Sequence, residues 1–273
     1  MEKEIKEFFK TTSPKKYYGQ NFLTDKNIIG KIITKSDLTK NDVIIEVGAG
    51  LGSLTFAMSP LVKKVIAIEI DKSLVPMLKS KATSNVEIIK GDVLKLDVNS
   101  LIAPYENVKI IANLPYYITT AIINKFLTAK VQSLTFMMQK EVGERLIARP
   151  NTKSYGSLSI ALQYLTEITL ITKVSRSCFY PKPTVDSVVL NLTPRPYHLL
   201  PENEDFFFAL VRCAFGNRRK TLVNSLITGD FEPDKSRIIR ALTSLGLKEN
   251  VRAQELGIEN YVQLADLLIN REF

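Results

Sequence analysis

Val43-Ile44-Ile45-Glu46-Val47-Gly48-Ala49-Gly50-Leu51-Gly52 is the stretch that decides the fold of this chain. Its β-branched run predicts a buried strand, and its glycines allow a sharp turn and a close approach to a ligand. A dinucleotide site would place a third glycine where Ser53 stands. The pattern after Glu46 therefore fits S-adenosylmethionine better than NAD. A tight turn in another α/β fold is the alternative interpretation.

Further short β-branched runs follow this stretch and alternate with helical segments. They predict strands at 65–68, 86–89, 108–112 and 134–138. Strands that alternate with helices indicate a parallel sheet with right-handed crossovers, an α/β fold of the Rossmann-like type. Two later runs, 168–174 and 185–192, predict late strands that could form an antiparallel hairpin at the sheet edge.

The end of the chain has a different pattern. Pro194, Pro196 and Pro201 mark a linker. Helical apolar spacing follows at 205–215, 219–226, 234–245 and 261–269. The predicted organisation is a catalytic domain at 1–196, which begins with a flexible arm at 1–23, and a small helical domain at 197–273.

Composition limits the class of protein. The 273 residues carry a net charge of +9, and residues 201–273 contain 10 basic and 11 acidic groups, so the excess lies earlier in the chain. A basic chain suggests a polyanionic partner without proving one. No apolar stretch reaches the length of a membrane helix, and the charged start is not a secretory signal. One histidine and two cysteines without metal spacing predict no metal site, and a reducing cytoplasm is the expected compartment.

Acidic residues follow the second and third predicted strands. Glu69 lies roughly 20 residues after the glycines, where a carboxylate accepts hydrogen bonds from ribose hydroxyls. Asp92, before Val93, is placed to accept a hydrogen bond from an adenine amino group. Both could instead be ordinary strand-end or turn residues. Because open α/β sheets bind ligands at the carboxyl ends of their strands, several polar strand ends together favour binding.

Asn113-Leu114-Pro115-Tyr116 follows the fourth predicted strand. The amide oxygen of Asn113 and a backbone carbonyl held by the proline can accept both hydrogen bonds of one NH2 group, and the tyrosine ring offers a face for a base. Adenine N6 is a poor nucleophile, and two acceptors would localise its lone pair and orient it, so that orientation and electrostatics carry the catalysis. Alone, the motif could equally be a turn.

Two further segments combine aromatic and basic residues. In 179–187, Phe179 precedes a stiff turn with Lys182 and could stack on the second face of a base, or could simply plug the sheet edge. A base would have to be unpaired or flipped out to reach such a pocket. In 15–23, Lys15 and Lys16 stand beside tyrosines that could contact phosphates and stack on bases, or could form a frayed terminus.

In order along the chain, these motifs resemble the KsgA-type ribosomal RNA small-subunit adenine dimethyltransferases, from about residue 15 to the end. The resemblance rests on these segments: Gly19-Gln20-Asn21-Phe22-Leu23, Glu46-Val47-Gly48-Ala49-Gly50, Glu69-Ile70-Asp71, Asn113-Leu114-Pro115-Tyr116, Gln139-Lys140-Glu141-Val142, Tyr155-Gly156-Ser157-Leu158-Ser159, 179–187 and Arg218-Arg219-Lys220-Thr221-Leu222.

The resemblance implies dimethylation of N6 on two adjacent adenosines near the 3′ end of 16S rRNA, with S-adenosylmethionine as donor. It also implies a role in small-subunit biogenesis, with the RNA in a pre-assembled 30S-type particle and the protein as a monomer. The implied cofactor contacts are Asn21, Leu23, Gly48, Gly50, Glu69, Ile70, Asp92, Val93 and Asn113. The implied catalytic set is Asn113, Leu114, Pro115, Tyr116 and Phe179. The helical domain at 197–273 is the implied RNA-contacting domain. The implied RNA contacts are Lys15, Lys16, Arg145, Arg149, Lys182, Arg218, Arg219 and Lys220.

One residue departs from the family pattern, since Tyr117 stands where bacterial relatives often carry Asn. Three alternatives remain. The large-subunit methylase of macrolide resistance shares the glycine loop and the motif at Asn113, but the 218–222 segment and the helical tail favour the small-subunit enzyme. DNA adenine methylases usually carry Asp at the position of Asn113. A non-catalytic RNA-binding assembly factor is the third alternative.

Overall fold

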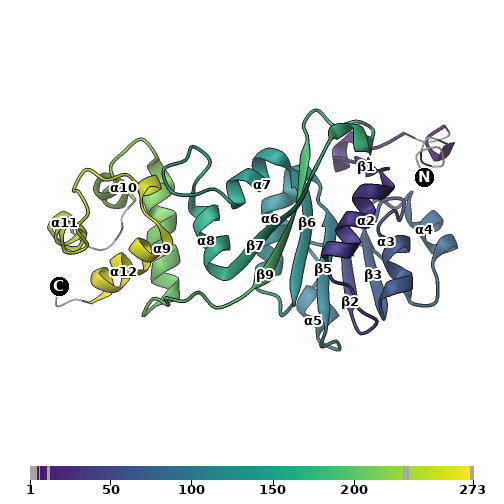
Figure 1. The fold of residues 1–273 in the computed structure, drawn as a ribbon, viewed down its shortest axis with the longest axis horizontal. Coiled ribbons are helices and arrows are strands. Elements are labelled where there is room, and N and C mark those ends of the chain that lie inside the picture. The colour runs from purple at the N-terminus through teal and green to yellow at the C-terminus, as the bar shows by residue number, and fades with distance from the viewer. Residues whose placement is uncertain (1–4, 6, 11–12, 230, 232–233, 271–273) are drawn as a thin grey trace. The chain divides into compact units, whose positions relative to one another are not determined.

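The computed structural model describes residues 5, 7–10, 13–229, 231 and 234–270. These residues form two compact units, and a seven-stranded sheet is the centre of the first unit (Figure 1). The strands lie in the order β4-β3-β2-β5-β6-β9-β7. Their bounds are β2 Val43–Val47, β3 Lys64–Glu69, β4 Val86–Lys90, β5 Val108–Asn113, β6 Ser133–Gln139, β7 Thr166–Val174 and β9 Ser187–Pro194. Strands β2 to β6 pair with one another in parallel, and β9 runs antiparallel to β6. The predicted parallel sheet and its late edge strands are confirmed.

The central strands are buried because helices cover both faces of the sheet. Every residue of β2 is buried, as expected for a continuous apolar run in a parallel sheet. The helices of this unit are α2 Lys26–Lys35, α3 Thr55–Met58, α4 Val75–Lys81, α5 Val98–Ile102 and α6 Thr119–Leu127, and α7 Lys140–Leu146 spans the division between the units. Ile28 and Ile32 of α2, Met58 of α3 and Leu78 of α4 share one apolar cluster with β2 and β3. The strand order then sends α5 and α6 to the opposite face by right-handed crossovers.

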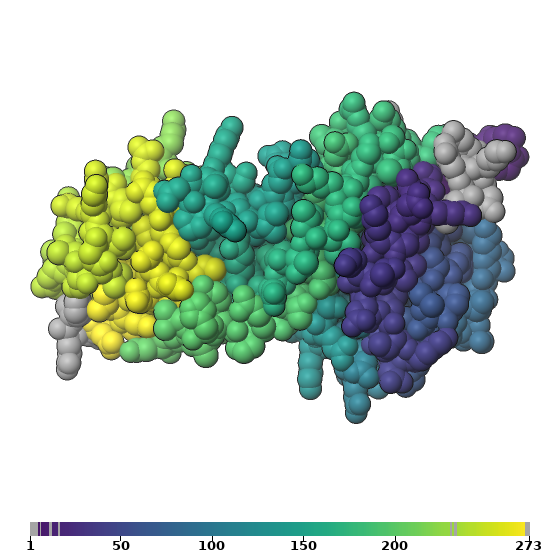
Figure 2. All heavy atoms as spheres, viewed as in Figure 1, coloured from purple at the N-terminus to yellow at the C-terminus, as the bar shows by residue number. Residues whose placement is uncertain are grey.

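The N-terminal arm is joined to the late part of the same unit. β1 Phe22–Leu23 pairs with β8 Phe179–Tyr180 in a separate two-stranded sheet. Figure 2 shows the purple start of the chain directly beside green residues of its later part. A 3-10 turn, Lys16–Tyr18, precedes β1. The described part of the arm is therefore packed on the unit, while its flexibility remains a prediction and residues 1–4, 6 and 11–12 lie outside the described chain.

The second unit contains 144–167 and 195–273. Its helices are α8 Ser157–Leu165, α9 Glu204–Ala214, α10 Leu222–Thr228, α11 Lys235–Ser244 and α12 Ile258–Ile269. Phe207 of α9, Leu226 of α10 and Tyr261 of α12 are fully buried in one apolar core. The four helices predicted in the tail are thus present, with ends shifted by a few residues.

The compact units divide the chain differently from the predicted ranges 1–196 and 197–273. Residues 144–167 belong with the tail, so the chain passes between the units three times. The physical reason is the apolar face of α8, where Ile160 and Tyr164 are buried in the same core as Phe207. The ring of Tyr164 lies 4.9 Å from that of Phe207. Periodicity identifies such a face but not the core that buries it.

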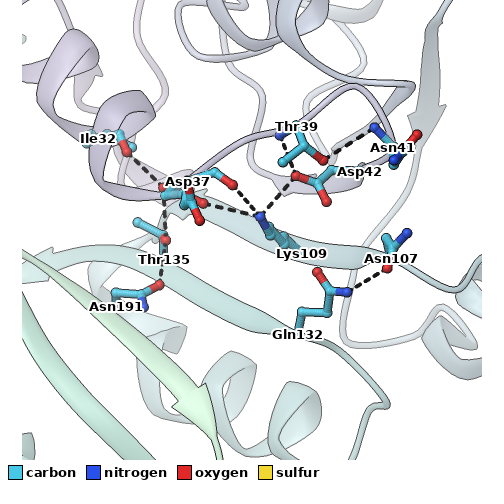
Figure 3. Close-up of polar contacts among 11 residues, drawn as sticks. Ile32, Asp37, Thr39, Asn41, Asp42, Asn107, Lys109, Gln132, Thr135 and Asn191 are labelled. Atoms are coloured by element: carbon cyan, nitrogen blue, oxygen red, sulfur yellow. Dashed lines mark hydrogen bonds and ion pairs between the residues drawn. The ribbon is translucent and has the colours of Figure 1, made fainter.

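A buried ion pair ties α2 to the sheet at the amino end of the strands. Lys109 of β5, 8% exposed, places Nζ 2.9 Å from Oδ2 of Asp42 and donates to the carbonyls of Ser36 and Asp37 (Figure 3). The backbone N–H of Thr39 donates to the same Oδ2. Lys109 therefore neutralises Asp42 and caps the carbonyls at the end of α2 with one side chain.

No helix among the described residues is long and apolar enough to cross a membrane. Within the same residues, no group of His, Cys, Asp and Glu side chains is arranged to hold a metal ion.

We expect Lys109→Met to lower the free energy of unfolding by about 3–5 kcal/mol, because Asp42 then keeps a buried charge without a partner. Urea unfolding of both proteins measures the difference. The exposed Lys63→Met is the matched control and should change stability little. The double variant Lys109→Met/Asp42→Asn should regain part of the loss, and equal stability of Lys109→Met and wild type would contradict this role.

Candidate active site

A pocket opens at the carboxyl edge of the sheet, where β2, β3 and β5 end side by side. Its lining comes from residues 18–23, most of 46–54, Glu69 with Ile70, and 113–116. These segments are far apart in the sequence, and the parallel strand order brings them together. The order also reverses between β2 and β5, which is the position where open α/β sheets bind ligands.

The glycine loop after β2 forms the floor of the pocket. Gly48 and Gly50 adopt left-handed backbone angles, with φ of +75° and +60°. A Cβ at Gly50 would also lie 3.1 Å from the ring of Phe22, which belongs to the arm. Glycine is therefore required at position 50 both by the turn and by the close approach of the arm.

Glu69 stands at the end of β3 with its side chain inside the pocket wall. It is 4% exposed, and its two carboxylate oxygens accept backbone N–H groups from Gly50 at 2.7 Å and from Asp71 at 2.8 Å. Burial raises the pKa of this carboxyl, against the opposing effect of these backbone hydrogen bonds. Glu69 thus links the glycine loop to the turn after β3.

Glu46 is a second carboxyl in the pocket lining, and it is 2% exposed. The hydroxyl of Thr55 donates a short hydrogen bond to its Oε2. Burial raises the pKa of Glu46 to about 8, and the nearby Glu69 adds to this shift, while the bond from Thr55 opposes it. The sequence marked Glu46 as part of the glycine motif but assigned it no contact.

Asn113 ends β5 and faces the pocket from the other side of the glycine loop. Its side-chain Nδ2 donates to the carbonyl of Asn21 in the arm at 2.9 Å. This contact uses the donor end of the amide, so Oδ1 is the end that can accept hydrogen bonds from a ligand. The N–H of Leu114 donates to the carbonyl of Met137 at 2.9 Å, which fixes the next peptide of the motif.

Tyr116 completes the motif and contributes a half-buried ring to the lining. Its hydroxyl lies 2.9 Å from Oγ of Ser187. Burial raises the pKa of Tyr116, so the hydroxyl is neutral near pH 7. The hydrogen bond fixes one end of the ring while its face remains part of the pocket wall.

Most of the predicted cofactor and catalytic residues are brought together, but three are not. Asn21, Leu23, Gly48, Gly50, Glu69, Ile70 and 113–116 line the pocket, whereas Phe179, Asp92 and Val93 do not. Phe179 is 4% exposed and packs in the apolar core beside Leu23. The pairing of β8 with β1 places Phe179 opposite Leu23, which lines the pocket, and the role of Phe179 toward a base stays a prediction.

Asp92 and Val93 lie just beyond β4, the strand next to β3, which ends at Glu69. The N–H of Gly91 donates to the carbonyl of Glu69 at 3.0 Å, which places this turn next to the end of β3. Asp92 is half-buried and accepts the N–H of Leu94 at 3.0 Å, whereas Val93 is buried. Their role toward the cofactor stays a prediction.

The predicted RNA contacts divide into several groups. Arg145, Arg149, Lys182, Arg219 and Lys220 are exposed. Arg218 donates to the carbonyls of Lys153 at 2.9 Å and Tyr155 at 2.7 Å, so it also holds a loop of its own unit. Lys15 forms an ion pair with Asp71. The side chain of Lys16 lies outside the described part of the chain.

The structure adds pocket residues that the sequence analysis missed. Tyr18, Gly19, Gln20 and Phe22 of the arm contribute to the lining. The Gly19–Leu23 motif was recognised, but its packing over the pocket depends on a strand pairing with residues far along the chain. In the sequence, only the aromatic residues beside Gly19 indicated that this segment lines the pocket, and that indication is weak.

The chain is similar to known proteins in both sequence and structure. The family model described as ribosomal RNA adenine dimethylase matches residues 11–270. Ribosomal RNA small subunit methyltransferase A of Alkaliphilus oremlandii is 49% identical, over 94% of this chain and 92% of the relative. The protein of the same name from Bacillus mycoides is 43% identical, over 93% and 91%.

Two solved structures resemble this fold closely. A dimethyladenosine transferase from Plasmodium falciparum has a TM-score of 0.74 at 27% identity, over 89% of this chain and 95% of that one. The 23S rRNA methyltransferase ErmE has a TM-score of 0.72 at 26% identity, over 92% and 100%. The fold of this chain is thus shared, over most of its length, with these two transferases.

We expect the free energy of unfolding to fall as pH rises from about 4.5 through about 8, partly because of Glu46. In that interval the folded state keeps a proton on Glu46 that the unfolded chain has lost, so stability declines by up to about 1.4 kcal/mol per pH unit. Glu46→Gln should flatten this decline, as measured by urea unfolding at pH 5.5 and 8. The exposed Glu106→Gln is the control and should keep the wild-type slope; an unchanged slope in Glu46→Gln would contradict the assignment.

Proposed function

This chain belongs to the ribosomal RNA adenine dimethylase family, and on that premise we propose how its pocket works and on which RNA. The enzyme transfers methyl groups from S-adenosylmethionine to N6 of two adjacent adenosines near the 3′ end of small-subunit (16S) rRNA. The products are N6,N6-dimethyladenosines. The two relatives described above, at 49% and 43% identity, both carry a small-subunit name.

The observation that carries the proposal is the orientation of Asn113. Its Nδ2 is held by the carbonyl of Asn21, so Oδ1 is available as an acceptor at the end of β5. The carbonyl of Leu114, held by the following proline ring, is the second acceptor. Two acceptors match the two protons of an exocyclic adenine amine and would align its lone pair toward the methyl donor.

The donor side of the pocket fits S-adenosylmethionine. The carboxylate of Glu69 suits ribose hydroxyls, and the left-handed glycine backbone leaves room where a Cβ at Gly50 would meet Phe22. The bound cofactor supplies a strongly electrophilic methyl group. The chain then has to bind and orient this cofactor and exclude water from it. Glu69, the glycine loop and the arm residues Asn21 and Leu23 would do this.

The wider setting of the reaction is also part of the proposal. The substrate RNA is bound within a pre-assembled 30S-type particle by a monomeric, cytoplasmic enzyme that acts in small-subunit biogenesis. Arg145, Arg149, Lys182, Arg219 and Lys220 are the exposed basic residues offered to its phosphates. The flipped or unpaired adenosine would lie over Tyr116, while Phe179 could reach it only if its buried ring became accessible.

Incubation with labelled S-adenosylmethionine and unmodified small or large ribosomal subunits tests this function. We expect label only on N6 of two adjacent adenosines of the small subunit. Asn113→Ala should lower transfer far more than it weakens S-adenosylmethionine binding, measured by calorimetry, because the variant removes an acceptor for the amine and only one of several contacts of the arm. Transfer at the wild-type rate would contradict the role of Asn113.

The alternatives give different outcomes in the same experiment. Label on an adenosine of the large subunit would identify the macrolide-resistance type of enzyme. Binding of small subunits with no transfer to any RNA would identify a non-catalytic assembly factor.

If Arg219 and Lys220 contact phosphates, the double variant Arg219→Ala/Lys220→Ala should reduce the salt dependence of RNA binding. Two lost contacts lower the slope of log K against log salt by about 1.4 for a single strand. Filter binding at several salt concentrations measures it. The pair Lys235→Ala/Lys248→Ala, also exposed and in the same unit, is the matched control. Equal slopes for the two double variants would remove the phosphate role.

A further inference from the structure

We propose that Asp71 is a positioning residue that anchors the N-terminal arm over the methyl-donor pocket through Lys15 and Gln20. The proposal rests on the function proposed above for that pocket. It assigns to Lys15 a role in donor binding in place of the phosphate contact expected from the sequence.

The anchor is a compact set of hydrogen bonds around one carboxylate. Nζ of Lys15 lies 2.5 Å from Oδ1 of Asp71, and Nε2 of Gln20 donates to Oδ2 at 2.8 Å. The backbone N–H of Lys15 donates to Oε1 of Gln20 at 2.7 Å, which closes the set within the arm. Each oxygen of Asp71 therefore holds a different point of the arm.

The environment makes this contact stronger than a surface ion pair. The side chain of Asp71 is 2% exposed, whereas that of Lys15 is 41% exposed. Burial raises the pKa of Asp71, but the hydrogen bonds from Lys15, Ser73 and Gln20 outweigh it and lower the pKa to about 2. The carboxylate therefore keeps its charge at every pH at which the protein would work, and a buried charge needs its partner.

The anchor lies next to the residues that would hold the donor. The N–H of Asp71 donates to Oε1 of Glu69, so one turn carries both the donor-binding carboxylate and the arm anchor. The arm residues that follow Lys15 and line the pocket include Gln20, whose side chain reaches Asp71. If the turn after β3 moves, the arm and Glu69 move together.

The arm also contacts the other two sides of the pocket. The ring of Phe22 lies against Gly50 of the glycine loop, and the carbonyl of Asn21 holds Nδ2 of Asn113. A loose arm would therefore disturb the donor wall directly. Because residues 18–23 line the pocket, a loose arm would weaken the binding of each donor that enters it.

Calorimetric titration of S-adenosylmethionine into the protein without RNA tests the anchor. We expect Lys15→Met to weaken binding by about tenfold or more, because a hydrogen-bonded charge pair is lost. Lys15→Arg should retain binding near the wild-type value. Lys10→Met is the matched control, since Lys10 forms an exposed ion pair with Glu7 on the same arm; it should bind like wild type.

Two further measurements separate the anchor from a general loss of structure. Lys15→Met should lower the thermal midpoint, because Asp71 then keeps a buried charge without its cation, but the loss of order should be local. Amide hydrogen exchange should become faster at residues 15–23 and stay at the wild-type rate in the central strands of the sheet. Asp71→Asn keeps the shape of the turn and removes the charge, and it should weaken donor binding in the same direction. It supplies the test should Lys15→Met fail to fold.

The outcomes are distinct. Wild-type affinity for S-adenosylmethionine in both Lys15→Met and Asp71→Asn would overturn the anchor. Weakened RNA binding with unchanged donor affinity in Lys15→Met would overturn it too, and would return Lys15 to a phosphate role. If the wild-type protein binds no S-adenosylmethionine, and the donor-site variant Glu69→Ala gives the same result, the proposed function fails, and the anchor fails with it.

Discussion

The parallel register of β2 with β3 and β5 is the constraint on which the site depends. Val47 lies opposite Ile68 on one side and Ala112 on the other, so the glycine loop, Glu69 and Asn113 all begin at the same level of the sheet. A shift of one residue in either pairing would move a side chain of this set to the other face. Such a shift would also put each buried side chain of β2 in the place of its neighbour, which the close packing of the core opposes, so the fold sets the spacing of donor and acceptor groups.

Three carboxyls gather around this edge, and the structure stabilises each in a different way. Glu46 is buried beside Thr55 and is held neutral by its surroundings, with a pKa near 8. Glu69 is held by two backbone N–H groups, and Asp71 has Lys15 as a cation. If all three were ionised without partners, their mutual repulsion in a buried site would oppose folding. Of the three, Asp71 alone has a side chain of the N-terminal arm as its cation, which makes the arm part of the electrostatic balance of the pocket.

Local features of the sequence predicted much of this site, and long-range pairings account for what it missed. Glu69 and Asn113 could be placed because each follows an apolar run, and parallel strands end at one edge. The ion pairs Lys109–Asp42 and Lys15–Asp71 join residues 67 and 56 positions apart, for which no spacing rule exists. The burial of Phe179 depends on a two-residue pairing of β8 with β1, which could not be read from either segment alone. The membership of 144–167 in the second unit was missed for the same reason.

Tyr117 shows how the arm connects these observations. It stands one residue after the amine-binding motif, is 57% exposed, and its ring lies at the arm, since a Cβ at Gly19 would come within 3.4 Å of it. Gly19 has a left-handed backbone with φ of +60°, so a side chain there would be strained as well as crowded. The tyrosine is thus placed to support the arm from the acceptor side, while Asp71 holds it from the donor side. An asparagine at position 117 would be too short to reach Gly19 in this way, so the length of the tyrosine side chain is what brings this position into contact with the arm.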